Sequence, residues 1–199
     1  AEAAAHPLLD PKKRITNDFG IKNEEFFIIT GANMAGKSTF LRTVSLQIVM
    51  SNVGLPVCAT SCTYSPIKLI TSMRTSDSLS DDESYFFSEL KRLKFIVEAI
   101  KTDTYFIILD EILKGTNSTD KAIGSRKFIE KLVGSKSTGI IATHDLSLCE
   151  VSKELPQVKN HYFDAEIINN ELHFDYRFKD GVCQNMNASF LLKKMEIVD

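Results

Sequence analysis

The feature that most constrains this chain is a loop at residues 31–38, which reads GANMAGKS and fits the pattern GxxxxGK[ST] at every required position. The apolar run at residues 25–30 has the length of a buried strand, and apolar residues recur at helical spacing from Thr39 to about Asn52. Strand, loop and helix in this order are the setting that the pattern requires. The sequence therefore predicts a loop whose backbone N–H groups, with the helix N-terminus, point at phosphate oxygens.

The loop also suggests which side chains do what. We expect Lys37 to reach the β- and γ-phosphates of a nucleoside triphosphate, and the Ser38 hydroxyl to hold Mg²⁺. A chance Gly-Lys-Ser turn ahead of a helix is the alternative, which the strand and helix on either side disfavour. The residues expected to contact ATP here are Gly31, Ala32, Asn33, Met34, Ala35, Gly36, Lys37, Ser38 and Thr39.

A second buried-strand run, at residues 105–109, ends in Asp110-Glu111. A carboxylate at the carboxyl end of a parallel strand lies beside such a loop, so we expect Asp110 to bind Mg²⁺. Glu111 is placed to polarise a water for attack on the γ-phosphate. On its own, an Asp-Glu pair after an apolar run is more often a solvated strand end.

A third strand, at residues 138–142, ends in Thr143-His144-Asp145. A neutral His144 at this position can hydrogen-bond the γ-phosphate or the attacking water. Taken alone, such a histidine is usually a polar strand end; as the third strand-end group of one site it is expected to act in catalysis with Lys37 and Glu111.

The composition of the chain excludes several classes of protein. With 199 residues, 43% hydrophobic and 25% charged, the chain is expected to form one compact domain over residues 1–199, neither disordered nor fibrous. A net charge of −2 argues against a free-standing DNA-binding module. The apolar runs are too short to span a membrane, no signal peptide is evident, and the scattered cysteines (Cys58, Cys62, Cys149 and Cys183) favour reduced thiols in the cytoplasm.

Further elements complete the expected fold. Residues 65–72 read as a strand, 73–84 as a polar loop, and about 85–101 as a helix. The face of that helix is expected to carry Phe86, Leu90, Leu93, Val97 and Ile100. A helix is expected over about 118–133 with Asp120 near its N-terminus, a hairpin over 161–178 turning at Asn169-Asn170, and a short helix over 188–195.

Six motifs in order make this chain resemble the ATPase domain of the MutS family of DNA mismatch-repair proteins. They are TGANMAGKST, GLPVCA at 54–59, SYFFSEL at 84–90, LDEI at 109–112 with Gly115-Thr116 and Asp120, IATH at 141–144, and HPLL at 6–9. The resemblance covers nearly the whole chain and suggests a segment of a longer protein. It implies an α/β fold: a P-loop NTPase of the ABC-ATPase-like type, with a mostly parallel central sheet flanked by helices and a C-terminal β-hairpin.

The resemblance also implies roles for particular residues. Asn33 looks like the loop asparagine that contacts the γ-phosphate region. Ser84 looks like the serine that reaches the nucleotide of a partner in trans across a homodimer, although an ordinary helix N-cap is the alternative. Ile15, next to Arg14, and Tyr176 match positions that flank the adenine; an aromatic residue in a hairpin is as often core packing.

The chain departs from the family pattern in several places. Asp82-Glu83 replace the usual Gly-Arg before the signature serine, and residues 113–118 read LKGTNS where the family has GRGTST. Lys121 stands where a glycine is usual, and Ala35 replaces a loop glycine. These departures suggest a divergent member of the family.

The function implied is Mg²⁺-dependent ATP binding and hydrolysis that couples nucleotide state to dimerisation and to DNA binding in mismatch repair or a related DNA transaction. DNA would be bound by domains outside this chain, and no membrane contact is expected from it. The alternative is a nucleotide-gated dimerisation module that does not act in mismatch repair. A transporter or chromosome-maintenance ATPase is less consistent, because an LSGGQ-type signature is missing.

Overall fold

The computed structural model describes residues 1–73, 85–169 and 171–184. The strands are β1 (Phe26–Gly31), β2 (Lys68–Ser72), β3 (Tyr105–Asp110), β4 (Thr138–Ala142), β5 (Val158–Phe163), β6 (Ala165–Ile168), β7 (Glu171–Phe174) and β8 (Lys179–Asp180). The helices are α1 (Lys37–Asn52), α2 (Tyr85–Ala99), α3 (Ser118–Gly134), a 3₁₀ turn (Leu146–Glu150) and α4 (Val151–Glu154).

A mostly parallel sheet forms the centre of the fold. Its order is β2-β3-β4-β1-β5-β8, and of these strands β8 alone is antiparallel to its neighbour. Because β4 lies between β1 and β3, the carboxyl ends of these three strands lie along one edge of the sheet. That edge is where open α/β sheets bind ligands.

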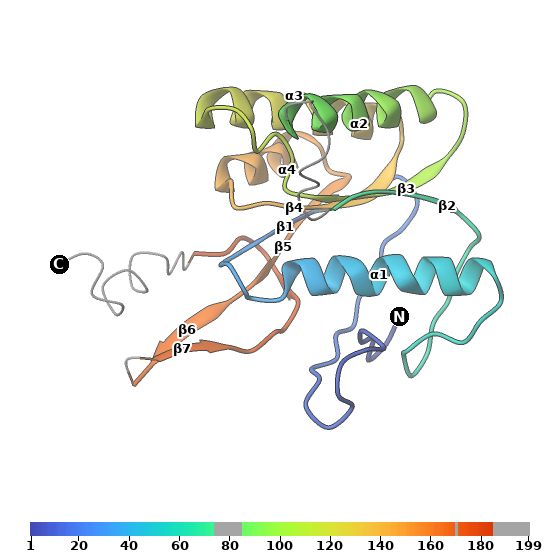
Figure 1. Cartoon of the computed structure of the whole chain (residues 1–199), viewed down its shortest axis with the longest axis vertical. Coiled ribbons are helices and arrows are strands. Elements are labelled where there is room, and N and C mark those ends of the chain that lie inside the picture. Colours follow the sequence, from blue (N-terminus) through green and yellow to red (C-terminus); the bar gives the residue numbers. More distant parts are fainter. Residues whose placement is uncertain (74–84, 170, 185–199) are drawn as a thin grey trace.

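Helices cover both faces of the sheet, α1 on one side and α2, α3 and α4 on the other (Figure 1). Successive strand residues point to opposite faces, so Phe26 and Ile28 pack towards α2 and α3, while Phe27 and Ile29 pack towards α1. The strands are buried on both sides, which explains why they read as continuous apolar runs. The architecture is therefore the expected α/β sheet flanked by helices.

The helices begin and end close to the expected residues. Asn117 caps α3 by accepting a hydrogen bond from the Asp120 backbone N–H, at 2.9 Å, which places Asp120 in the first turn as predicted. The expected apolar face of α2 was partly wrong. Leu93 and Ile96 are buried, and the expected Phe86 and Ile100 pack against the same core, whereas Leu90 is 38% exposed. The apolar stripe that faces the sheet includes Ile96 and leaves Leu90 at its margin.

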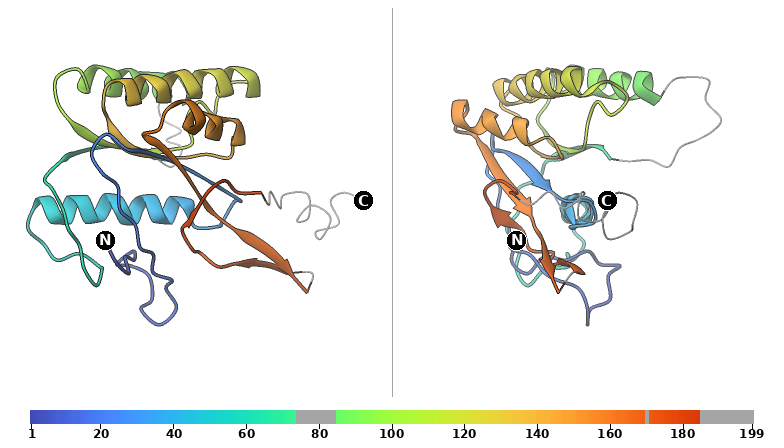
Figure 2. Two further views of the ribbon diagram at one scale, coloured as in Figure 1. Left: turned by 180° about the vertical axis from the view of Figure 1, so that it is seen from behind. Right: turned by 90° about the vertical axis from the view of Figure 1, so that its left-hand side faces the viewer.

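The hairpin prediction also needs correction. Residues 161–163 belong to β5, which runs parallel to β1 in the central sheet, and the hairpin is the shorter β6–β7 pair. The reason is that residues 161–163 of β5 alternate between buried and partly buried, like a hairpin strand, so their pattern does not reveal the parallel pairing with β1. Figure 2 shows the hairpin projecting from the body of the domain. Residues 74–84 of the loop expected over 73–84, and the whole helix expected over 188–195, lie outside the described residues.

None of the helices in the described part of the chain combines the length and the apolar character that crossing a bilayer requires.

Candidate functional site

A cavity of about 890 Å³ opens at the carboxyl ends of β1, β3 and β4, a volume suited to a small ligand. The sequence-predicted site residues that line it are Ile15, Asn33, Met34, Gly36, Lys37, Ser38, Thr39, Asp110, Glu111, His144 and Tyr176. Three other predicted residues, Gly31, Ala32 and Ala35, belong to the same loop but do not line the cavity. Ser84 lies outside the described residues, so its predicted contact stays a prediction.

The loop from Gly31 to Gly36 needs its two glycines. Gly31 has φ of 141° and Gly36 has φ of 108°, a backbone conformation that side chains rarely tolerate. A Cβ on Gly31 would also lie 2.3 Å from the Phe163 carbonyl oxygen in the neighbouring strand. Gly36 is the N-cap residue of α1, and it has no side chain that could accept hydrogen bonds from the first backbone N–H groups of the helix. Those N–H groups remain directed at the edge of the cavity.

Lys37 is buried, with 7% of its surface exposed, and its ammonium folds back onto the loop. Its Nζ donates hydrogen bonds to the carbonyl oxygens of Gly31 and Ala32, both at 2.7 Å. These bonds hold the loop closed around the lysine stem. They also keep a positive charge at the cavity wall, where an anionic ligand would find it.

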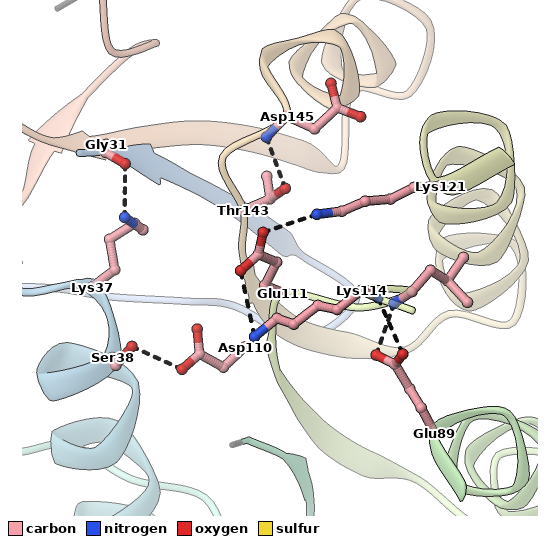
Figure 3. A network of polar contacts seen from close by, with 11 residues as sticks. Gly31, Lys37, Ser38, Glu89, Asp110, Glu111, Lys114, Lys121, Thr143 and Asp145 are labelled. Atoms are coloured by element: carbon pink, nitrogen blue, oxygen red, sulfur yellow. Dashed lines mark hydrogen bonds and ion pairs between the residues drawn. The ribbon is translucent and has the colours of Figure 1, made fainter. Parts of the chain in front are cut away.

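Ser38 and Asp110 meet from two elements far apart in the sequence. The Ser38 hydroxyl, in the first turn of α1, donates a hydrogen bond of 2.7 Å to Asp110 Oδ2 at the end of β3 (Figure 3). A hydroxyl and a carboxylate are hard oxygen ligands, and Mg²⁺ is commonly held by one or two such groups with substrate phosphates and water. The pair therefore fits Mg²⁺. Within residues 1–73, 85–169 and 171–184, no group of three or more His, Cys, Asp or Glu side chains converges into a larger metal site.

Glu111 is held by two lysines that the sequence interpretation did not connect with it. Its Oε1 lies 2.8 Å from Lys121 Nζ, and its Oε2 lies 3.4 Å from Lys114 Nζ. Burial raises the pKa of Glu111, but the hydrogen bond from Lys121 and the charges of Lys121 and Lys114 outweigh it and hold the pKa below its ordinary value. Glu111 is therefore an anion with a salt-bridged carboxylate.

The backbone at Glu111 is unusual as well. Its φ is 54°, and its N–H donates a hydrogen bond of 2.8 Å to the Ala142 carbonyl of β4. A positive φ in a residue other than glycine or asparagine is uncommon, and it turns the chain sharply where β3 ends. Leu113, two residues on, has φ of 58°.

Glu89 of α2 stabilises this turn. Its carboxylate accepts hydrogen bonds from the backbone N–H groups of Leu113, at 2.7 Å, and Lys114, at 3.1 Å. Gly115 lies tightly under the same helix, since a Cβ there would come 2.6 Å from the Phe86 Cβ. The sequence motif SYFFSEL contains both α2 residues, but its periodicity gave no sign that Glu89 binds this loop.

His144 lines the cavity, and the charges of both Lys37 and Glu111 act on its imidazole. Burial, and then the Lys37 charge, lower the pKa of His144, while the Glu111 carboxylate acts in the opposite direction. The lowered pKa favours the neutral imidazole, the form that the sequence interpretation assumed. The preceding Thr143 is buried, and its hydroxyl accepts the Asp145 N–H at 3.0 Å, which fixes the turn after β4.

The N-terminal segment and the turn after β7 form the other wall of the cavity. Tyr176, which is 43% exposed, packs beside Gly36, where an added Cβ would come 3.3 Å from its ring. The Tyr176 carbonyl accepts a hydrogen bond of 3.0 Å from the Asn17 side chain, which joins the two segments. Ile15 lines the same cavity, so the structure brings together the two residues predicted to flank a base.

Comparison with known proteins gives consistent matches. A family model described as MutS domain V matches residues 27–196. The "DNA mismatch repair protein MSH4" of Arabidopsis thaliana is 31% identical over 98% of this chain, and the "MutS protein homolog 4" of Homo sapiens is 30% identical over 96%. The "DNA mismatch repair protein MutS" of Aquifex pyrophilus is 31% identical over 90%. The matches cover 25%, 21% and 22% of the lengths of these relatives, so this chain corresponds to about a quarter or less of each.

Proposed function

Because this chain belongs to the MutS family and matches its domain V, we propose that it is a P-loop ATPase domain that binds Mg²⁺ and ATP in the cavity at the carboxyl ends of β1, β3 and β4. The observation that carries the proposal is the hydrogen bond between Ser38 and Asp110, at 2.7 Å, in the cavity that Glu111 and His144 also line. In support of the proposal, two oxygen groups of the kind that bind Mg²⁺ lie in the same cavity as the Glu111 carboxylate and the N-terminus of α1.

Binding of the triphosphate would use the Gly31–Gly36 loop and the Lys37 ammonium. Lys37 Nζ donates hydrogen bonds to the Gly31 and Ala32 carbonyls. Because an ammonium can donate three hydrogen bonds, an anionic phosphate could also bind it or replace one of these carbonyls as its acceptor. Bound Mg²⁺ would neutralise charge on the phosphates. Ile15 and Tyr176 would flank the adenine, and Asn33 would lie near the γ-phosphate.

Hydrolysis would proceed by in-line attack of a water on the γ-phosphorus. The water oxygen forms a bond to phosphorus, the bond from phosphorus to the β–γ bridging oxygen breaks, and ADP and inorganic phosphate are released. The Glu111 carboxylate takes the proton that the water loses. The neutral His144 imidazole hydrogen-bonds the water or the γ-phosphate and holds it in line.

We place this ATPase in a homodimer that couples nucleotide state to DNA binding, in mismatch repair or a related DNA transaction. The names of the relatives support the pathway, and the resemblance supports the composite site, with Ser84 of one protomer completing the site of the other. DNA would be bound by other parts of a longer chain, since this segment corresponds to about a quarter of its relatives.

A second candidate function is a nucleotide-gated dimerisation module in which turnover is incidental. The pairing of the Glu111 carboxylate with Lys121 and Lys114 favours it, because a salt-bridged carboxylate is a weaker base. In that case ATP binding alone would drive association, and Glu111→Gln would leave function intact.

Two variants test the proposal. Lys37→Ala should weaken ATP binding by about tenfold or more, since it removes a charge-assisted contact of about 1.5–3 kcal/mol. Glu111→Gln should keep ATP binding while turnover falls by about 10²–10⁴-fold, the usual contribution of a positioned base. Calorimetry showing wild-type affinity in Lys37→Ala would refute the proposed nucleotide site.

A mixing experiment tests the composite site. Ser84→Ala and Lys37→Ala subunits should each be poorly active alone, and mixing them should restore part of the activity. A mixed dimer keeps one site in which an intact Lys37 faces an intact Ser84. Turnover that is independent of protein concentration, with no recovery on mixing, would show that each protomer acts alone.

A further inference from the structure

The turn that follows β3 holds Glu111 in a backbone conformation that a glutamate disfavours. Glu111 has φ of 54° and Leu113 has φ of 58°, so both adopt the left-handed region. Neither is a glycine, asparagine or aspartate, the residues that adopt this region most readily. Strained backbone of this kind persists only where the surrounding structure holds it, and it is common at functional sites. The position of the Glu111 carboxylate therefore depends on what holds the turn.

Different elements hold the two ends of the turn. At its start, the Glu111 N–H donates a hydrogen bond of 2.8 Å to the Ala142 carbonyl of β4. At its other end, the Glu89 carboxylate of α2 accepts the N–H of Leu113 at Oε1, at 2.7 Å, and the N–H of Lys114 at Oε2, at 3.1 Å (Figure 3). Hydrogen bonds from backbone N–H groups to a carboxylate are stronger than those to a neutral acceptor. A single side chain of α2 thus holds the free end of the turn with both of its oxygens.

Glu89 restrains Glu111 by two routes. Along the backbone, it fixes the residue two positions after Glu111. Through a side chain, it fixes the backbone of Lys114, whose Nζ lies 3.4 Å from Glu111 Oε2. Loss of the Glu89 carboxylate would release both the main chain after Glu111 and the base of a side chain that contacts its carboxylate.

We propose that Glu89 is a positioning residue for hydrolysis, which keeps the Glu111 carboxylate where it can take the proton of the attacking water; the inference rests on the proposed ATPase function. Glu89 does not line the cavity, so it acts on the reaction only through the turn. The groups proposed to bind the nucleotide are held by other contacts: Lys37 by loop carbonyls, and Ser38 by Asp110. Loss of Glu89 should therefore slow the chemical step and leave the affinity for ATP unchanged.

Apolar packing is the competing explanation for the position of the turn. Ile112 and Leu113 are only 2% and 8% exposed, and a Cβ on Gly115 would come 2.6 Å from the Phe86 Cβ. If this packing alone fixed the turn, Glu89 would contribute to stability and nothing more. The rate of hydrolysis per folded molecule would then be the same with and without it.

The test compares Glu89→Gln and Glu89→Ala with Glu98→Gln, which changes an exposed acid of the same helix. Single-turnover hydrolysis of ATP with Mg²⁺ reports the chemical step. Calorimetry reports the affinity and the number of binding sites, so each rate is expressed per folded, ATP-binding molecule. Glu89→Gln should hydrolyse about tenfold more slowly and Glu89→Ala about 10²-fold more slowly, at unchanged affinity, because a small displacement of a reacting group costs rate steeply. Glu98→Gln should match the wild type.

A double variant shows whether the effect passes through Glu111. In the Glu111→Gln background, Glu89→Gln should cause no further loss, because the carboxylate that it positions is already absent. An unchanged rate per binding site in Glu89→Gln, a matching loss of affinity, or an equal loss with and without Glu111 would each overturn the positioning role and leave the ATPase proposal standing. Glu89→Gln decides the matter alone if Glu89→Ala does not fold. If the wild type failed to bind ATP, or Glu111→Gln hydrolysed it at the wild-type rate, the proposed function itself would fail.

Discussion

The contact between Glu89 and the turn after β3 makes a quantitative prediction about stability. The Glu89 carboxylate accepts two backbone N–H groups, at 2.7 and 3.1 Å, from Leu113 and Lys114. Hydrogen bonds to a charged group contribute about 1.5–3 kcal/mol each, and the longer one lies at the weaker end. Leu113 is 8% exposed, so its N–H would lose its partner away from bulk water.

Glu89→Ala should therefore lower the free energy of unfolding by about 2–4 kcal/mol, a large share of the 5–15 kcal/mol typical of a domain. Glu89→Gln should cost less, about 1–2 kcal/mol, because its amide oxygen still accepts one N–H while its NH₂ faces the other. The positive φ of Leu113, 58°, adds to the cost, since a strained turn persists only while its surroundings hold it.

Urea unfolding followed by circular dichroism measures these changes directly. Glu98→Gln is the matched control, because Glu98 lies on the same helix and its partner is the exposed Lys101. That variant should shift the midpoint much less than either Glu89 substitution. If Glu89→Ala and Glu98→Gln had equal effects, the two backbone bonds would contribute nothing measurable and the reasoning would be wrong.

Three further predictions concern other parts of the molecule. Asp110→Asn should abolish the Mg²⁺ dependence of ATP binding, measured by titrating Mg²⁺ at fixed nucleotide, because the hard cation loses a carboxylate oxygen. Burial, with the charges of Asp145 and Glu150, raises the pKa of Cys149 to about 11, so a thiol reagent at pH 8 should label exposed Cys62 and spare Cys149 until the protein unfolds. Burial lowers the pKa of His161 in the folded protein. The stabilising contribution of the neutral imidazole is therefore fully present above the ordinary histidine pKa and is lost as the pH falls through the lowered pKa. His161→Phe should remove this pH dependence from the urea midpoint over that range.

The central strands could be predicted because they carry their own signal. β1, β3 and β4 lie in the middle of the sheet and are buried on both faces, so each reads as an apolar run that ends in polar residues. Their shared carboxyl edge follows from parallel pairing, and it brought Asp110 and His144 to the cavity of the loop as expected. For these parts, local pattern and three-dimensional arrangement agree.

The strand β5 was missed because its pattern depends on its place in the sheet. It pairs with β1 on one side and with the two-residue β8 on the other, and its residues 161–163 alternate between buried and partly buried. An alternating run followed by a turn signal at Asn169-Asn170 resembles one long hairpin. The structure separates β5 from the hairpin: β5 pairs with β1 up to Phe163, and the hairpin begins at Ala165, which pairs with Phe174.

The partners of Glu111 could not be read from the sequence for a different reason. Lys121 was conspicuous as a departure from a usual glycine, but nothing in the sequence says where the first turn of α3 lies relative to β3. The structure supplies that relation: the Asn117 cap starts α3 so that Lys121 reaches Glu111 at 2.8 Å. Contacts between side chains on separate elements depend on how those elements pack, which periodicity does not encode.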